Sequence, residues 1–356
     1  MTWKQKKLIL SRCIVLLFIV FSYLQWDEYT DFHQKNVEYS QESQKTIQEI
    51  SNFELDQLQL IENPEMFKTP NKKLLEQITN EINNAEKRVW LETYILTEKR
   101  IQQAVKKSHN NWIDVKVVLE KNPYKAYSIN NKSYKNLTGS WVNVHWSNTK
   151  NFSLNHSKFL LIDDFAYIST WNFSYSTFTK NRDFFVKTSD PKIIEKLEKI
   201  FINDYQWKKE IFEFPNLVIS PENTRTKFNK LVESAEKNID IYFQYAKDDK
   251  FLNELITASK KWIKIRIVFP KTMKDDTEVL NILKNNQIEY RFLEKNKMHS
   301  KAIYVDKKYL FLWSINFSHY SIDRNREIWI ILKNSKILSD FEKIFNNDFK
   351  QNITEK

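Results

Sequence analysis

The sequence contains almost no glycine. Gly139 is the only one in 356 residues, whereas average usage of about 7% would give roughly 25. Cysteine is also scarce, because Cys13 stands alone, and this excludes an intramolecular disulfide framework. Tryptophan, in contrast, occurs 11 times. Positions that normally need glycine must therefore be filled by other residues, and several tryptophans stand at such positions.

The remaining composition is that of a folded protein. Hydrophobic residues make up 41% and charged residues 28%, which excludes a fibrous or wholly disordered chain. The length allows two domains of ordinary size. The net charge of +11 favours anionic partners such as phosphates, lipid head groups or nucleic acid, but it does not choose among them.

The N-terminus carries an apolar run over residues 8–26, interrupted only by Arg12 and preceded by Lys4, Lys6 and Lys7. Because a spanning helix needs about 20 apolar residues, we expect residues 1–26 to form a cytoplasmic basic stub and one transmembrane anchor. A cleaved signal peptide is the alternative, although no small-residue cleavage site follows. The basic flank predicts a cell-membrane protein with its folded body on the extracytoplasmic side.

A polar segment rich in Gln and Glu follows at residues 27–52. Such a composition predicts a linker between the anchor and the folded body. Removing residues 1–26 takes away four positive charges and no negative ones, which leaves a body of 52 − 45 = +7. The body is therefore still basic.

The body contains an internal repeat. Two sets of residues share the same order and spacing, offset by 143 or 144 positions. They are His156, Lys158, Asp163, Asn172 and Asp183 in the first half and His299, Lys301, Asp306, Asn316 and Glu327 in the second. This duplication predicts two lobes, residues 53–212 and 213–356.

Each half also shows the same order of expected elements. Amphipathic helices alternate with apolar strands, then comes a hairpin with the His-x-Lys motif, and then a closing helix at residues 191–204 or 335–349. Strands alternating with helices predict an α/β fold, with mixed sheets flanked by helices in two pseudo-symmetric lobes.

The repeated residues suit chemistry on a phosphodiester. His and Lys two positions apart on a strand face the same side. Lys158 and Lys301 can neutralise phosphate oxygens, assisted by the amides of Asn172 and Asn316.

The two histidines can divide the remaining work. One imidazole can attack phosphorus while the other, on the opposite side, acts as general acid. A neutral nucleophilic imidazole needs an acceptor at its second ring nitrogen, and Asp183 and Glu327 are the candidates.

The doubled His-x-Lys-x4-Asp motif resembles the phospholipase D superfamily over about residues 56–350, and it is similar to bacterial phospholipase D-like and cardiolipin synthase-like members. The resemblance implies that His156 is the nucleophile, forming a phosphohistidine, and that His299 is the general acid. It also implies that Asp163 and Asp306 support the motif backbone, and that neither a metal nor another cofactor is needed.

The resemblance leads us to expect a phosphodiesterase that hydrolyses or transfers phosphatidyl esters, with a phospholipid or other phosphodiester as substrate. The alternatives are an endonuclease acting on DNA or RNA and a cardiolipin synthase-like phosphatidyltransferase. A non-catalytic scaffold that binds anionic surfaces is a further alternative. Because one chain supplies both motifs, a single chain is expected to form a complete catalytic unit.

The tryptophans depart from the family pattern, in which small residues precede the active-site Asn. We therefore hypothesise that several tryptophans arise from UGA codons that encode glycine in the source. The candidates are Trp112, Trp171, Trp262, Trp313 and Trp329, with Trp141 weaker. We interpret Trp90, Trp146 and Trp207 as genuine aromatic positions. The alternative is that all are genuine and the protein is an inactive relative.

Overall fold

The computed structural model describes residues 41–313 and 317–350. The chain divides into two units, Met1–Glu49 and Ile50–Lys356. Residues 41–51, within the expected linker, are helical. The expected anchor at residues 8–26 lies outside the described residues. In the ranges that are described, no helix is long and apolar enough to cross a membrane.

The unit from Ile50 onward contains two lobes, and the first is built on seven strands and five helices within the described ranges. The strands are β1 (Glu65–Lys68), β2 (Arg88–Thr93), β3 (Asp114–Leu119), β4 (Asn143–Trp146), β5 (Lys158–Ile162), β6 (Phe165–Ser169) and β8 (Phe184–Thr188). The helices are α2 (Lys72–Asn83), α3 (Lys99–Asn110), α4 (Asn131–Thr138), α5 (Tyr175–Thr179) and α6 (Pro191–Tyr205).

The second lobe repeats this set. Its strands are β9 (Leu217–Ser220), β10 (Asn238–Tyr242), β12 (Lys264–Pro270), β13 (Glu289–Leu293), β15 (Ala302–Val305), β16 (Tyr309–Leu312) and β18 (Glu327–Leu332). Its helices are α7 (Thr224–Glu233), α8 (Asp249–Lys260), α9 (Thr277–Asn285), α10 (His319–Asp323) and α11 (Ser335–Lys350). Shorter elements are η1 (Leu55–Gln57), β7 (Asn181–Arg182), β11 (Ala246–Lys247), η2 (Lys271–Asp275), β14 (Lys297–Met298) and β17 (Phe317–Ser318).

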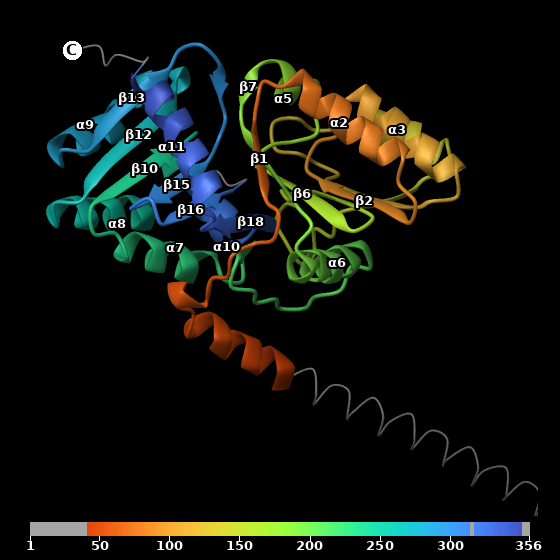
Figure 1. Cartoon of the computed structure of the whole chain (residues 1–356), viewed down its shortest axis with the longest axis horizontal. Helices are drawn as coiled ribbons and strands as arrows, with labels where there is room; N and C mark the ends of the chain where they lie inside the picture. Colours follow the sequence, from red (N-terminus) through yellow and green to blue (C-terminus); the bar gives the residue numbers. More distant parts are fainter. Residues whose placement is uncertain (1–40, 314–316, 351–356) are drawn as a thin grey trace, which may run out of the picture. The chain divides into compact units, whose positions relative to one another are not determined.

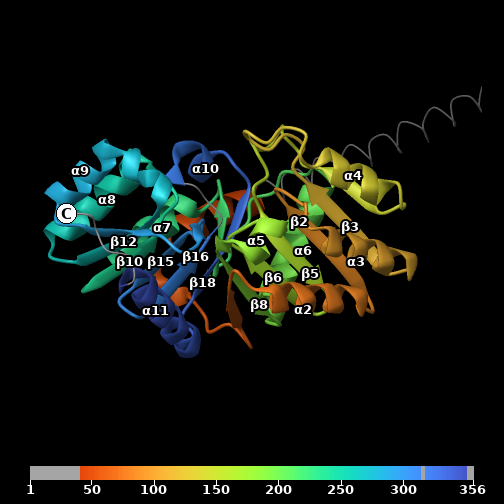
Figure 2. The ribbon, with the colours of Figure 1, turned by 90° about the horizontal axis from the view of Figure 1, so that it is seen from above.

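The two sheets have the same topology. The strand order is β1-β8-β6-β5-β2-β3-β4 in the first lobe and β9-β18-β16-β15-β10-β12-β13 in the second. In both sheets the last three strands are parallel to one another and the other neighbours are antiparallel. The lobes lie side by side, with α2 and α3 in one and α7 and α8 in the other (Figures 1 and 2). The predicted α/β fold with two pseudo-symmetric lobes is thereby confirmed.

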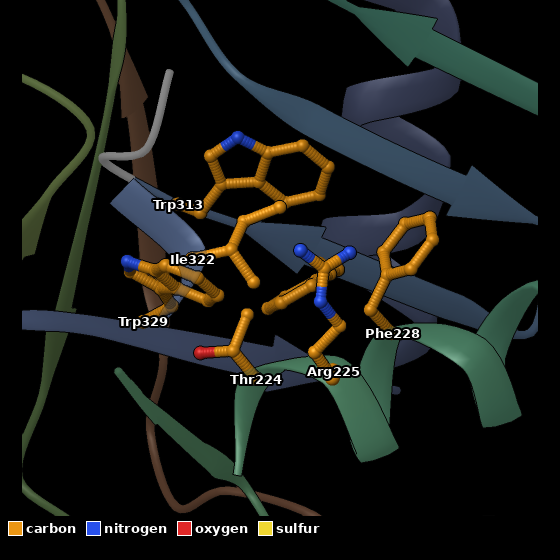
Figure 3. A pocket seen from close by; sticks show the side chains of 7 residues that line it. Thr224, Arg225, Phe228, Trp313, Ile322 and Trp329 are labelled. Atoms are coloured by element: carbon orange, nitrogen blue, oxygen red, sulfur yellow. The ribbon is translucent and has the colours of Figure 1, made fainter. Parts of the chain in front are cut away.

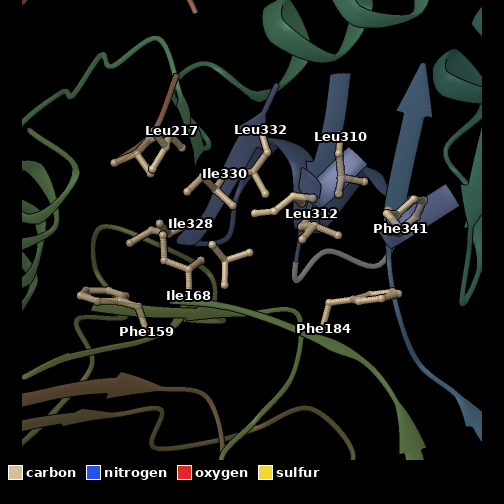
Figure 4. Close-up of a cluster of buried hydrophobic side chains, with 14 of the residues drawn as sticks. Phe159, Ile168, Phe184, Leu217, Leu310, Leu312, Ile328, Ile330, Leu332 and Phe341 are labelled. Carbon is tan, nitrogen blue, oxygen red and sulfur yellow. The ribbon is translucent and has the colours of Figure 1, made fainter. Parts of the chain in front are cut away.

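Successive side chains along a central strand point to opposite faces of the sheet, and each face packs into a different hydrophobic core. In β5, Phe159 and Leu161 point into a core shared by the two lobes, whereas Leu160 and Ile162 point into a core that also holds residues of α2 and α3. The shared core joins strands of both sheets to α6 and α11, and Figure 4 shows Phe159 and Ile168 of the first lobe facing Ile328 of the second. This core holds the two motif hairpins in one body.

Candidate active site

Each His-x-Lys segment begins against the other lobe. β14, which leads into His299, pairs in parallel with β7 of the first lobe, and the His299 amide donates to the Arg182 carbonyl at 3.2 Å. Reciprocally, Asn155 bridges to Arg326, and the His156 amide donates to the Arg326 carbonyl at 2.8 Å. The Asn-Arg-acid segment of one lobe therefore positions the histidine of the other.

The same exchange pairs each imidazole with a carboxylate across the lobes. His156 Nδ1 lies 2.8 Å from Glu327 Oε2, and His299 Nδ1 lies 3.5 Å from Asp183 Oδ1. Both carboxylate side chains are buried. A hydrogen bond from Nδ1–H to Glu327 fixes the tautomer of His156 in which Nε2 carries a free lone pair. The structure thus places both candidate acceptors beside the histidines: Glu327 contacts His156, and Asp183 lies near His299.

The motif lysines are buried beside their own histidines. Lys158 Nζ donates to the His156 carbonyl, and Lys301 Nζ donates to the His299 carbonyl at 2.9 Å while lying 2.9 Å from His299 Nδ1. Tyr94, at the end of β2, packs its ring 4.4 Å from the His156 ring and 5.3 Å from Lys158 Nζ. The sequence analysis missed Tyr94, because nothing in the repeat marks it.

The protonation of these groups is set by burial and by one another. Burial lowers the pKa of His156 to about 4, with Glu327 opposing the shift and Lys158 adding to it. Burial lowers the pKa of His299 well below its usual value, and the charges of Lys301 and Lys158 lower it further. Because groups of each lobe influence those of the other, the two motifs form one electrostatic site.

Burial shifts the pKa values of Lys301 and Asp183 toward neutrality from opposite sides. Burial lowers the pKa of Lys301 to about 7, with Asp183 and Glu327 opposing the shift. Burial raises the pKa of Asp183 to about 7, with Lys301 opposing it. A charged Lys301 and a charged Asp183 therefore favour each other.

The two predicted phosphate-binding amides are described unequally. Asn172 is buried, and its Oδ1 has no hydrogen-bond partner among the described residues. A buried amide oxygen without a partner is costly in a folded protein. Asn316 lies outside the described residues.

Asp163 and Asp306 lie beyond the far ends of the motif strands β5 and β15, away from the lysines. Each carboxylate accepts three backbone N–H groups at the entry to the neighbouring strand, at distances between 2.6 and 3.0 Å. The donors are Glu86, Lys87 and Arg88 for Asp163, and Glu236, Lys237 and Asn238 for Asp306. Both carboxylates brace the strand entry, and the structure shows no contact of either with a motif histidine.

Two buried arginines, which the repeat matches to each other but to which the sequence analysis gave no role, hold the lobes together around this site. Arg182 pairs with Asp348 of α11 at 2.8 Å, and Arg326 pairs with Asp204 of α6 at 2.9 Å. Each pair crosses between the lobes. The two aspartates share the spacing of the repeat, since 348 − 204 = 144, and this offset was the signal available in the sequence. Because the arginine carbonyls accept from the histidine amides, these pairs position the segments that carry His156 and His299.

Comparison with known families places one match on each lobe. The family model described as "Cardiolipin synthase, PLD-like domain" matches residues 78–205 and 229–349. These two ranges contain both His-x-Lys motifs and both histidine-facing carboxylates.

Known relatives carry several names. A cardiolipin synthase of Clostridium perfringens is 23% identical over 327 residues, which cover 78% of this chain and 68% of that protein. A polyphosphate kinase of Yersinia pestis is 24% identical over 285 residues, covering 74% of this chain and only 41% of the kinase. The crystal structure of a phosphatidylserine synthase of Haemophilus influenzae superposes with a TM-score of 0.65 at 13% identity, covering 88% of this chain and 91% of that one. This last likeness establishes a shared fold.

Proposed function

The chain belongs to the PLD-like family of the phospholipase D superfamily, and on that premise we propose that it hydrolyses or transfers phosphatidyl esters through a phosphohistidine at His156. The observation that carries the proposal is the exchange of carboxylates between lobes, which faces His156 with Glu327 and His299 with Asp183. It supplies two oriented imidazoles in one buried site that also holds Lys158 and Lys301.

The first chemical step is attack by His156 on phosphorus. With Nδ1–H bound to Glu327, the lone pair of Nε2 forms the P–N bond. The bond from phosphorus to the leaving oxygen breaks, and His299 gives that oxygen a proton. Lys158 and Lys301 stabilise the charge that builds on the non-bridging oxygens.

The second step releases the phosphatidyl group. Water or an acceptor alcohol gives its proton to His299 and attacks phosphorus, and the P–N bond to His156 breaks. Hydrolysis and transfer therefore differ only in the acceptor. The imidazole of His156 returns to its neutral form, and its low pKa of about 4 keeps it neutral at physiological pH.

Substrate binding prepares His299 to act as an acid. Burial is the first cause of its lowered pKa, and the positive charges of Lys301 and Lys158 are the next. A phosphodiester carries a negative charge that offsets these cations, so its arrival raises the pKa of His299. Asp183, which lies 3.5 Å from His299 Nδ1, stabilises the protonated imidazole when its carboxylate is charged.

Two features support a phospholipid as the substrate. Two of the similar proteins, the cardiolipin synthase and the phosphatidylserine synthase, carry lipid names. The body without residues 1–26 has a net charge of 52 − 45 = +7, which suits an anionic membrane surface. The predicted anchor would hold the body at the extracytoplasmic face of the cell membrane.

All activity measurements use protein with glycine at position 171, the residue hypothesised there from the sequence. The test offers this protein phosphatidylglycerol, phosphatidylcholine and single-stranded DNA. We expect lipid turnover that His156→Ala abolishes and that His299→Ala lowers about 10²–10⁴-fold. His109→Ala is the matched control, since His109 lies in the last turn of α3 and has no counterpart in the repeat. Cleavage of DNA with inert lipids would replace the proposal with a nuclease, and no turnover of any substrate would leave a binding scaffold.

A further inference from the structure

Tryptophan occupies backbone positions that glycine normally fills. Eleven non-glycine residues in the described part of the chain have positive φ. Four of them are Trp112, Trp141, Trp207 and Trp262, with φ between 59° and 66°, although Trp accounts for only 11 of 356 residues. A bulky side chain in this left-handed region is an outlier. Gly139, the one glycine, has φ of −64°, a right-handed conformation that any residue can adopt.

All four tryptophans end a helix in the same way. In each case the next residue's amide donates to the carbonyl five positions back and the tryptophan's own amide donates to the carbonyl three positions back, as in a Schellman cap. After α3, for example, Ile113 N bonds to the Ser108 carbonyl at 3.2 Å and Trp112 N to the His109 carbonyl at 3.0 Å. The same pair of bonds follows α4, α6 and α8. The position with positive φ in this cap is the one where glycine is most favoured.

Packing does not explain three of these tryptophans. Trp112 is 95% exposed, Trp262 89% and Trp141 85%, whereas a large aromatic ring normally contributes by being buried. Trp207 is 54% exposed, and its indole donates to the Trp146 carbonyl at 3.0 Å. Our interpretation of Trp207 as an ordinary aromatic position does not fit its backbone, which places it with the other three.

Trp171 obstructs the active site. The centre of its ring lies 3.0 Å from the centre of the His299 imidazole, at an interplanar angle of 63°. Edge-to-face aromatic pairs pack with centres about 4.5–7 Å apart, so there is no room for both rings and a substrate. The indole also lies 5.3 Å from Lys301 Nζ, where the proposed function needs a phosphate oxygen.

We propose that residues 112, 141, 171, 207 and 262 are glycine in the native protein, encoded by UGA codons that the source decodes as glycine. Glycine at four of these positions removes the backbone conflict at helix ends. Glycine at 171 removes the ring beside His299 and Lys301, and the space that it leaves is the phosphate-binding pocket. The assignment of a phosphate-binding pocket rests on the proposed function, whereas the assignment of glycine to the five positions does not.

The proposal does not include two further tryptophans in the second lobe, because the structure gives no reason to replace them. Trp313 and Trp329 are buried and surround a small apolar cavity with Phe228 and Ile322 (Figure 3). Neither has positive φ. Trp329 also corresponds to Phe185 of the first lobe at the repeat offset, 329 − 185 = 144. Glycine at these two positions stays a prediction from the sequence.

Tandem mass spectrometry of the protein isolated from its source cells tests the proposal. Peptides that span the five positions are expected to contain glycine, and the gene is expected to have UGA codons there. Trp90 and Trp146 are the matched controls, because they stack on Phe201 and Tyr134 with ring centres 5.2 and 4.1 Å apart. They should appear as tryptophan encoded by UGG.

Tryptophan in the peptides that span 112, 171 or 262, or UGG codons at these positions, would overturn the proposal. Because the readout is the identity of a residue, an enzyme that proves inactive on lipids would not change it. Failure of the proposed function and failure of this proposal are therefore distinguishable.

Discussion

At His156, the carboxylate of Glu327 controls both the tautomer and the pKa of the imidazole. The hydrogen bond of 2.8 Å directs Nδ1–H to Glu327 and leaves the Nε2 lone pair free. Burial lowers the pKa of His156, and the charge of Glu327 is the main influence that raises it. A change at Glu327 is therefore expected to alter the pH dependence of His156, the proposed nucleophile, as well as its orientation.

Glu327→Gln is expected to lower kcat/KM by about 10²–10⁴-fold, the range seen for general acid–base and triad carboxylates. It also removes the charge that raises the pKa of His156, so the pKa falls further. Because kcat/KM is lost as His156 becomes protonated, the acid limb of the pH profile moves from near pH 4 to lower pH. The measurement is kcat/KM across the acid range.

The control is Glu278→Gln on α9, which removes an exposed carboxylate with no part in the site. It should leave the profile unchanged. An acid limb that stays in place in Glu327→Gln would mean that Glu327 only supports the fold.

For individual site residues, the sequence predicted which residue types are needed but not which carboxylate contacts which histidine. The repeat singled out Asp183 and Glu327 as acceptors. It could not assign them, because each lobe holds an equivalent pair and only the cross-lobe pairing of β7 with β14 decides the matter. Tyr94 was missed since its contact with His156 depends on the tertiary packing of β2.

The aspartate at the turn of each motif hairpin holds the hairpin against the start of the neighbouring strand. Asp163 accepts the backbone amides of Glu86, Lys87 and Arg88 at the entry to β2, and Asp306 does the same at the entry to β10. A carboxylate that satisfies several backbone donors stabilises the segment that provides them.

Asp163→Ala is expected to lower the free energy of unfolding by about 1–3 kcal/mol, because donors at the strand entry lose their acceptor. Chemical denaturation measures this loss. Asp164→Ala is the matched control: Asp164 is 78% exposed and pairs with Lys87 at the surface, so its loss should cost at most about 1 kcal/mol. Equal losses in the two variants would refute the bracing role.

Most of the regular elements could be predicted from periodicity. The closing helix α6 begins at Pro191, where the expected helix began, because Asp190 caps it and proline suits the first turn. The two-residue strands β7 and β14 could not be predicted, since so short a segment has no period and pairs only with the other lobe.

For the whole body, the shared core determines whether the site exists at all. Phe341 of α11 is fully buried between the lobes and packs on Phe184 of the first lobe and Tyr242 of the second. The site groups come from both lobes. Loosening this core therefore separates each histidine from its carboxylate.

Phe341→Ala is expected to cost about 3–5 kcal/mol, the usual penalty for emptying a buried aromatic site. Both lobes should still unfold in one transition at lower denaturant, as followed by circular dichroism and tryptophan fluorescence. Tyr175→Ala, which truncates an aromatic ring on a residue 60% exposed, is the control and should change little. Two separated transitions would contradict a single cooperative body.

The central claim is that a covalent bond forms between phosphorus and His156, and trapping that intermediate tests it most directly. His299→Asn is offered a phosphodiester with a nitrophenol leaving group, which departs without a proton, while hydrolysis stalls for want of a base. The account predicts that mass spectrometry of the quenched protein finds the phosphorus adduct on the peptide containing His156, and that His156→Ala shows none. Release of nitrophenol with no adduct at His156 would contradict the account.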